Sequence, residues 1–159
     1  MVSVTRKTIV TSLRVALGWV MLYAGITKVL NPHWSAAGYL KGAQTWHGLY
    51  AWFGQPALLP VVNFLNEWGL TLLGVSLILG VFVRLGSVLG AILMLLYYFP
   101  VLDFPMVGEQ GYIVDEHIVY MLVLLWLAAV RAGRVCGLDA ILAKSRLYRI
   151  RQNLGTYLG

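Results

Sequence analysis

Residues 58–100 read LLPVVNFLNEWGLTLLGVSLILGVFVRLGSVLGAILMLLYYFP, and the predicted fold rests mainly on this segment. Its only charged residues are Glu67 and Arg84. A helix that crosses a bilayer needs roughly 20 mostly apolar residues at about 1.5 Å each. The stretch therefore predicts two spans, 58–82 and 85–100. Because the link around 83–85 is so short, the two spans should be antiparallel neighbours.

The rest of the 159-residue chain is similarly apolar, with 60% hydrophobic and only 11% charged residues. Soluble domains have about a quarter charged residues and no more than about half apolar ones. Two further apolar segments, 9–30 and 117–131, complete a predicted all-α membrane protein, a four-transmembrane-helix bundle. Because the first apolar run continues without a cleavage-like site, we expect a retained helix rather than a signal peptide. The predicted transmembrane domain is 1–137, and 138–159 follows as a tail.

The basic residues segregate to one end of this predicted bundle. One end carries ten basic residues and one acidic residue, Asp139, whereas the other carries two basic and five acidic residues. Since Lys and Arg are enriched on the cytoplasmic side of membrane proteins, both termini should be cytoplasmic, in a plasma-membrane protein. The ten basic residues are Arg6, Lys7, Arg14, Arg84, Arg131, Arg134, Lys144, Arg146, Arg149 and Arg151.

The segments outside the spans differ in character. Segment 31–57 is unusually aromatic, and Trp and Tyr favour the headgroup layer, so we expect one or two short helices on the membrane surface. They would form either a structural cap or a functional lid. Segment 101–116 is predicted to be a loop. In the tail, Asp139 should cap a basic amphipathic helix that lies on the anionic cytoplasmic leaflet.

Four ionisable residues on three predicted helices reach nearly the same outer level: Lys28, Glu67, Glu116 and His117. Ionisable groups within a membrane need a partner or a function. Lys28 and Glu67 are expected to form an ion pair, which Glu116 and His117 would extend into a proton-exchanging network. These four are the candidate catalytic residues. The competing interpretation is that they serve only to fix helix packing.

Aromatic residues lie at the same level as this polar cluster. They are Trp34, Trp68, Tyr97 and Tyr98. A polar cluster under aromatic side chains suits a quinone head group or another small polar molecule. No metal site is predicted, since there is one cysteine and the histidines lack ligand spacing on one helix face. A haem held by His47 and His117 is disfavoured, so redox chemistry would need a diffusible molecule such as quinone, or a partner subunit.

Small and basic residues in the spans have a structural interpretation. Gly18, Gly25 and the Gly86-x-x-x-Gly90 pair should let helices approach closely in lipid. Arg14 and Arg84 are expected to extend to the membrane interface.

Several motifs together resemble the DoxX/DoxD family of membrane proteins. They are Arg14-x3-Gly18, Tyr23-Ala24-Gly25-Ile26-Thr27-Lys28, Glu67-Trp68-Gly69, Leu79-Gly80-Val81-Phe82-Val83-Arg84 and Ala132-Gly133-Arg134-x2-Gly137-Leu138-Asp139. The resemblance implies a four-helix protein of quinone-linked respiration. Its DoxD branch is the small subunit of archaeal thiosulfate:quinone oxidoreductase, which acts with a partner subunit. The residues that carry over are Arg14, Gly25, Lys28, Glu67, Arg84 and Asp139.

Two functions are therefore expected as alternatives. The first is a quinone-associated oxidoreductase subunit of a respiratory complex. The second is a non-catalytic scaffold subunit of a larger, terminal oxidase-type electron-transport complex. Both imply lipid and other subunits, or a second copy of this chain, as partners, and neither implies nucleic acid.

Overall fold

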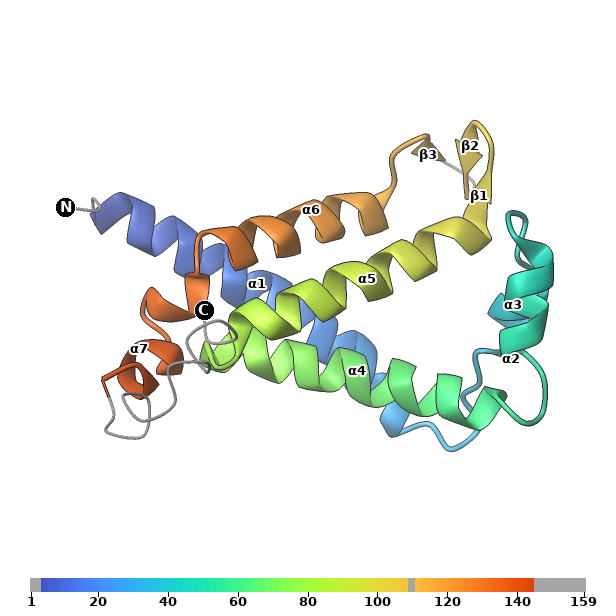
Figure 1. Cartoon of the computed structure of the whole chain (residues 1–159), viewed down its shortest axis with the longest axis horizontal. Helices are drawn as coiled ribbons and strands as arrows, with labels where there is room; N and C mark the ends of the chain where they lie inside the picture. Colours follow the sequence, from blue (N-terminus) through green and yellow to red (C-terminus); the bar gives the residue numbers. More distant parts are fainter. Residues whose placement is uncertain (1–3, 109–110, 145–159) are drawn as a thin grey trace.

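Four helices form an elongated bundle in the computed structural model, which describes residues 4–108 and 111–144 (Figure 1). These helices are α1 (Val4–Val29), α4 (Leu59–Leu79), α5 (Val83–Val101) and α6 (Glu116–Ala129). The first three are long and apolar enough to cross a membrane, whereas α6 is apolar but has only 14 residues. The described part of the chain thus has the helices of a multi-pass membrane protein.

The turn between α4 and α5 lies slightly earlier than predicted. Gly80 ends α4 in the left-handed conformation, with φ at 70°, which glycine adopts without a steric penalty. Phe82 then precedes α5 at its N-cap. The link is therefore formed by 80–82 rather than 83–85. Such a tight turn makes α4 and α5 antiparallel, as the sequence predicts.

The bundle is built from two helix pairs. α1 packs along α4, and α5 packs along α6. The pairs meet at the turn that joins α4 to α5, and from there α4 and α5 diverge towards the other end (Figure 1). Buried apolar side chains from all four helices fill the space between the pairs, and they include Leu17, Met21, Leu70, Leu73, Leu77, Met94, Leu124 and Leu127.

The diverging end of the bundle is covered by two short helices, α2 (Ala37–Lys41) and α3 (His47–Phe53) (Figure 1). We call the segment 31–58 that contains them the roof. It is fastened to the last turn of α5: the Gln44 amide donates to the Pro100 carbonyl at 2.9 Å, and Thr45 Oγ1 donates to the Leu102 carbonyl at 2.6 Å. Trp46 also stacks on Phe99, with ring centroids 4.0 Å apart.

The connection between α5 and α6 is more ordered than the predicted loop. It contains a small antiparallel sheet of β1 (Leu102–Asp103), β2 (Met106–Val107) and β3 (Gly111–Tyr112). The alternation of apolar and polar residues there is too short to stand out from a loop, so the prediction missed it.

At the opposite end, the guanidinium of Arg14 is completely buried, with 1% of the residue exposed. Nη1 donates to the carbonyls of Ala132 and Val135 at 3.0 and 3.2 Å, and Nη2 donates to that of Cys136 at 3.1 Å. These carbonyls belong to the turn around the short 3-10 helix η1 (Ala132–Arg134). The prediction that Arg14 extends to the membrane interface is therefore wrong, because its donors satisfy carbonyls inside the protein.

Asp139 is also buried at this end, and it does not cap its own helix, α7 (Leu138–Leu142). Its carboxylate instead accepts from the amides of Phe82 and Val83, at 2.9 and 3.2 Å, and so caps α5. The predicted capping of a tail helix is wrong in this respect. Most of that tail, 145–159, lies outside the described residues.

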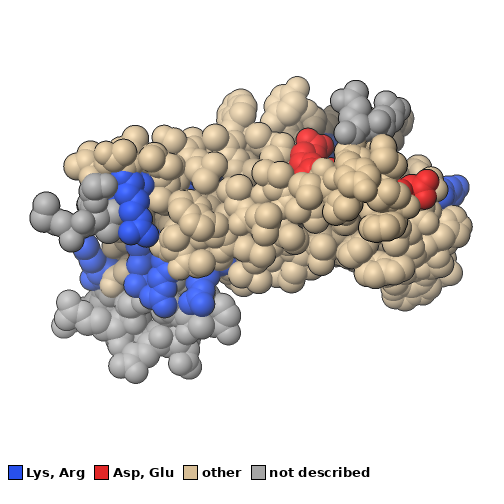
Figure 2. Space-filling model, turned by 90° about the horizontal axis from the view of Figure 1, so that it is seen from above, with Lys and Arg blue, Asp and Glu red and all other residues tan. Residues whose placement is uncertain are grey.

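Together, Arg14, Asp139 and the turns that they bind form what we call the basal knot. It joins α1, the turn between α4 and α5, and the segment after α6. Figure 2 shows Lys and Arg side chains gathered around this end of the molecule, and Asp and Glu side chains towards the roof. The charge segregation predicted from the sequence therefore appears in the fold.

Candidate functional site: a chamber between the helix pairs

A cavity of about 290 Å³ lies beneath the roof, where the two helix pairs diverge. We call it the polar chamber. Its walls come from α1, the roof, α4, α5 and α6, so that its shape depends on the whole half of the bundle next to the roof. It is lined by Lys28, Trp34, Ser35, Ala36, Tyr39, Asn66, Tyr97 and His117.

Lys28 supplies the cation of the chamber. Its Nζ lies 5.5 Å from the centroid of the Trp34 ring and donates to the Ala24 carbonyl, one turn earlier on α1, at 2.8 Å. An ammonium group has three donors. The bond to Ala24 uses one of them, and within the described residues the others are left for a ligand. The expected ion pair with Glu67 does not form, because the ammonium bonds to its own helix and faces the tryptophan.

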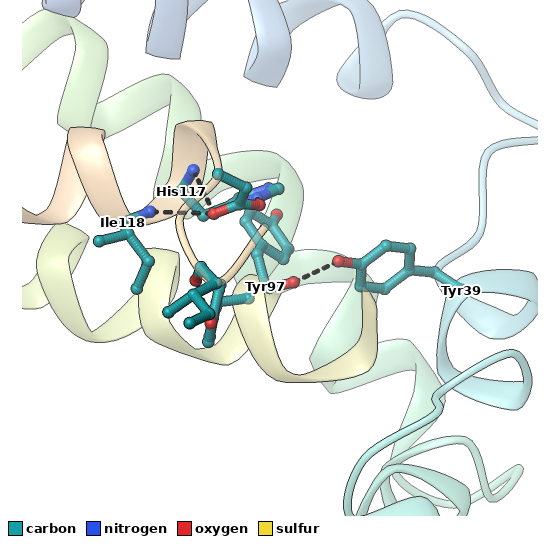
Figure 3. A network of polar contacts seen from close by, with 7 residues as sticks. Tyr39, Tyr97, His117 and Ile118 are labelled. Atoms are coloured by element: carbon teal, nitrogen blue, oxygen red, sulfur yellow. Dashed lines mark hydrogen bonds and ion pairs between the residues drawn. The ribbon is translucent and has the colours of Figure 1, made fainter. Parts of the chain in front are cut away.

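His117 supplies an imidazole, held by the residue that caps α6. Asp115 Oδ1 accepts from the amides of His117 and Ile118, at 3.0 and 3.2 Å, while its Oδ2 lies 2.5 Å from His117 Nδ1 (Figure 3). One carboxylate thus caps the helix and engages the ring. Because Nδ1 is occupied by Asp115, Nε2 is the ring nitrogen left for a ligand.

Two tyrosines and an asparagine form the wall facing these groups. The Tyr97 hydroxyl donates to Asn66 Oδ1, and the Asn66 side-chain amide donates to the Val62 carbonyl at 2.8 Å. The Tyr39 hydroxyl donates to the backbone carbonyl of Tyr97, a bond between roof and α5 that Figure 3 shows. Tyr97 also makes an edge contact with the His117 ring, at 5.7 Å between centroids.

The Tyr39 phenol belongs to the roof, outside the membrane-spanning helices. Although 38% of the residue is exposed, desolvation of its hydroxyl raises the pKa of Tyr39 well above its ordinary value. A raised pKa keeps the phenol protonated and able to donate. The bond from Tyr39 to the Tyr97 carbonyl is therefore maintained throughout the neutral pH range.

A second cavity, of about 140 Å³, adjoins the polar chamber. The two share Ala36, Tyr39, Asn66 and Tyr97 as a common wall. The other residues of the second cavity are apolar or aromatic: Leu40, Tyr50, Phe53, Val62, Leu65, Leu93 and Leu96. We call it the apolar slot. A polar compartment that adjoins an apolar one suits a ligand with a polar head and a hydrocarbon tail.

Half of the residues predicted for the site line the polar chamber. These are Lys28 and His117 of the predicted catalytic set, and Trp34 and Tyr97 of the predicted pocket. The others lie elsewhere. Glu67 and Glu116 do not line it, Trp68 is 42% exposed and contacts Phe64, and Tyr98 donates to the Ile113 carbonyl at 2.5 Å.

The sequence interpretation missed four lining residues, Ser35, Ala36, Tyr39 and Asn66. It also missed Asp115, which holds the His117 ring. Asn66 is next to the predicted Glu67, and successive residues on a helix point about 100° apart, so depth alone could not choose between them. Asp115 had a detectable signal, because an Asp immediately before an apolar helix is a favoured N-cap. That signal marks the helix start but not the bond to His117.

Within residues 4–108 and 111–144, no group of three or more His, Cys, Asp or Glu side chains could hold a metal ion. The polar side chains that line the chamber supply one ammonium, one imidazole held by a carboxylate, two phenols, one amide, one hydroxyl and one indole.

Comparison with known proteins gives one match. The DoxX family model matches residues 9–102, which run from α1 through α5 and carry every chamber residue except His117. No curated protein and no solved structure matches the chain. Since the match covers more than half of the chain, and the matched segment has the apolar helices of a membrane protein, the chain belongs to the DoxX family.

Proposed function

We propose that this chain is the quinone-binding membrane subunit of a respiratory redox complex. The observation that carries the proposal is the polar chamber next to the apolar slot. A quinone has two ring oxygens and an isoprenoid tail. Its head would lie between Lys28 and His117, and its tail would follow the leucine side chains of the slot towards lipid.

The proposal includes the topology that this ligand requires. α6 would complete a fourth span by means of the residues that flank it, so that both termini lie in the cytoplasm and the chamber opens near the outer leaflet. The roof would then lie in the headgroup layer of the plasma membrane. A partner subunit would exchange electrons with the bound quinone, because the chamber residues have no redox centre of their own.

Lys28→Ala in the full chain, reconstituted in lipid nanodiscs, tests the proposal. Charge-assisted hydrogen bonds contribute about 1.5–3 kcal/mol, so the affinity for decylubiquinone should fall roughly 10- to 100-fold. Quenching of tryptophan fluorescence measures it, since Trp34 lines the chamber. Lys41→Ala is the matched control, because Lys41 is an exposed cation of the roof outside the chamber.

Equal binding by the wild type and Lys28→Ala would contradict the proposal. If decylubiquinone only partitions into the lipid, and the chain purifies in fixed ratio with a membrane oxidase, the scaffold function is the correct one.

A further inference from the structure

We propose that Asp115 is a positioning residue that makes the polar chamber selective for the reduced, hydroquinone form of its ligand. This inference rests on the proposed function. It concerns which groups of the chamber donate hydrogen bonds to the ligand and which accept them. It follows from three observations: the contact between Asp115 and His117, the donor character of Lys28, and the absence of a carboxylate among the side chains that line the chamber.

The first step concerns the tautomer of His117. An ionised carboxylate only accepts hydrogen bonds, so at 2.5 Å His117 Nδ1 must carry a proton and donate it to Asp115 Oδ2. In a neutral imidazole, the other nitrogen is then an acceptor. In this neutral form Nε2 presents a lone pair to a ligand in the chamber. In the imidazolium form both ring nitrogens would donate, so the preference for the hydroquinone belongs to the neutral form.

The second step compares His117 with Lys28. The ammonium of Lys28 is a donor with no acceptor capacity. Lys28 thus offers donors, and Nε2 of the neutral His117 offers an acceptor. A ligand that fits both has an oxygen acceptor at one end and a hydroxyl donor at the other. A hydroquinone meets this requirement, because each of its hydroxyl groups both donates and accepts.

The oxidised quinone does not meet it. Both of its ring oxygens are carbonyls, which only accept, so one of them would face the Nε2 lone pair without a hydrogen bond. Leaving a buried polar group unpaired costs about as much as the bond itself is worth, or more. Discrimination between the two forms should therefore be roughly tenfold.

Asp115 is the titratable group that contacts a ring nitrogen of His117. The titratable groups that line the chamber with His117 are Lys28 on α1, Tyr39 in the roof and Tyr97 on α5. The hydroxyls of both tyrosines already donate to other acceptors. On α6 itself, the neighbouring Glu116 is exposed and does not line the chamber. Asp115 is therefore the group that fixes the imidazole.

Asp115→Asn separates the positioning role from the capping role. Asn is as good an N-cap as Asp, so the bonds to the amides of His117 and Ile118 should persist. The neutral amide no longer demands a proton on Nδ1. Asp103→Asn is the control, because Asp103 is an exposed carboxylate on β1 outside the chamber.

The experiment measures the affinities of decylubiquinol and decylubiquinone, anaerobically at pH 8, for the full chain in nanodiscs. The wild type and Asp103→Asn should bind the quinol about tenfold more tightly. In Asp115→Asn the ratio should approach one, with both forms still bound. The ¹⁵N chemical shifts of the His117 ring should show a proton on Nδ1 in the wild type, and lose that preference in the variant.

A wild type that binds both forms equally, or a ratio unchanged in Asp115→Asn, would overturn the inference while leaving quinone binding intact. If neither form binds the wild type, the proposed function itself fails. The two failures are thereby distinguished in one titration series.

Discussion

At the scale of single residues, Arg14 and Asp139 are the two buried charged residues of the basal knot, and their hydrogen bonds connect distant segments of the chain. Arg14 spans three carbonyls of the turn after α6, and Asp139 caps α5. Glycines make room for them: a Cβ on Gly80 would lie 2.4 Å from Arg14 Nη1, and one on Gly133 would lie 2.1 Å from Asp139 Oδ2. The motif residues that resembled the family by sequence therefore have a structural explanation here.

Arg14→Lys should destabilise the protein by about 2–4 kcal/mol, because a lysine keeps the charge but cannot bind three carbonyls with a planar fork. The measurement is thermal unfolding in detergent. Arg131→Lys is the control, since Arg131 is exposed near the same turn. Equal unfolding temperatures for the two variants would show that the geometry of the guanidinium is unimportant.

The Tyr39 phenol gives the roof a dependence on pH. Its pKa is raised in the folded protein, so its contribution to stability is present below the unfolded pKa of about 10 and is lost as the pH rises above it. The roof should therefore resist proteolysis from neutral pH to about pH 10 and become more susceptible above it. Tyr39→Phe should be more susceptible than the wild type below about pH 10, where the bond from Tyr39 is present, and should lack the part of this transition that Tyr39 causes. If Tyr39→Phe showed the same rise in proteolysis with pH as the wild type, another titratable group would be its cause.

At the scale of helices, the pairing of α1 with α4 depends on glycine at the points of closest approach. A Cβ on Gly25 would lie 2.4 Å from the backbone nitrogen of Thr71, and one on Gly74 would lie 2.4 Å from that of Leu22. These short distances support the packing role predicted for Gly25. With a larger residue at Gly25 or Gly74, the two helices could not approach so closely.

Gly25→Ala should destabilise the protein by about 1–3 kcal/mol, because the added methyl group meets backbone that cannot move aside. Gly69→Ala is the matched control within a helix, since its Cβ would meet only Leu93 Cδ2, at an ordinary 3.9 Å. It should be neutral or slightly stabilising, as alanine favours the helix. Unfolding temperatures in detergent compare the two, and similar losses in both would contradict the contact.

The helices themselves were predictable from the sequence, because long apolar runs and a glycine turn determine them locally. The site was only partly predictable. Counting residues along each helix placed Lys28 and His117 at the same level of the bundle. The rotation of a helix about its own axis decides which of two neighbouring residues faces inward, and it cannot be obtained from this count. Asn66 therefore lines the chamber and Glu67 does not. The basal knot was missed for a related reason: the bond between Arg14 and Cys136 joins residues far apart in the chain.

At the scale of the whole molecule, the charge segregation leads to a prediction about orientation. Cys136 is an exposed free thiol beside the basal knot, at the end where the basic residues gather. In intact cells, a membrane-impermeant maleimide should not label it until the membrane is permeabilised. In Cys136→Ser carrying Asp103→Cys, the thiol on β1 should be labelled from outside. The reverse pattern would invert the proposed topology.

Because the two helix pairs diverge from the basal knot, a change of angle at the knot would change the width of the chamber at the other end. α5 has 19 residues, so at about 1.5 Å per residue it is a lever about 28 Å long, and a rotation of about 5° at its base moves its tip by about 2.5 Å. That displacement is large enough to break a hydrogen bond. The width of the opening between Lys28 and His117 is thus set partly by bonds at the far end of the bundle. A partner that bound the turn between α4 and α5 would in this way open or close a site that it does not contact.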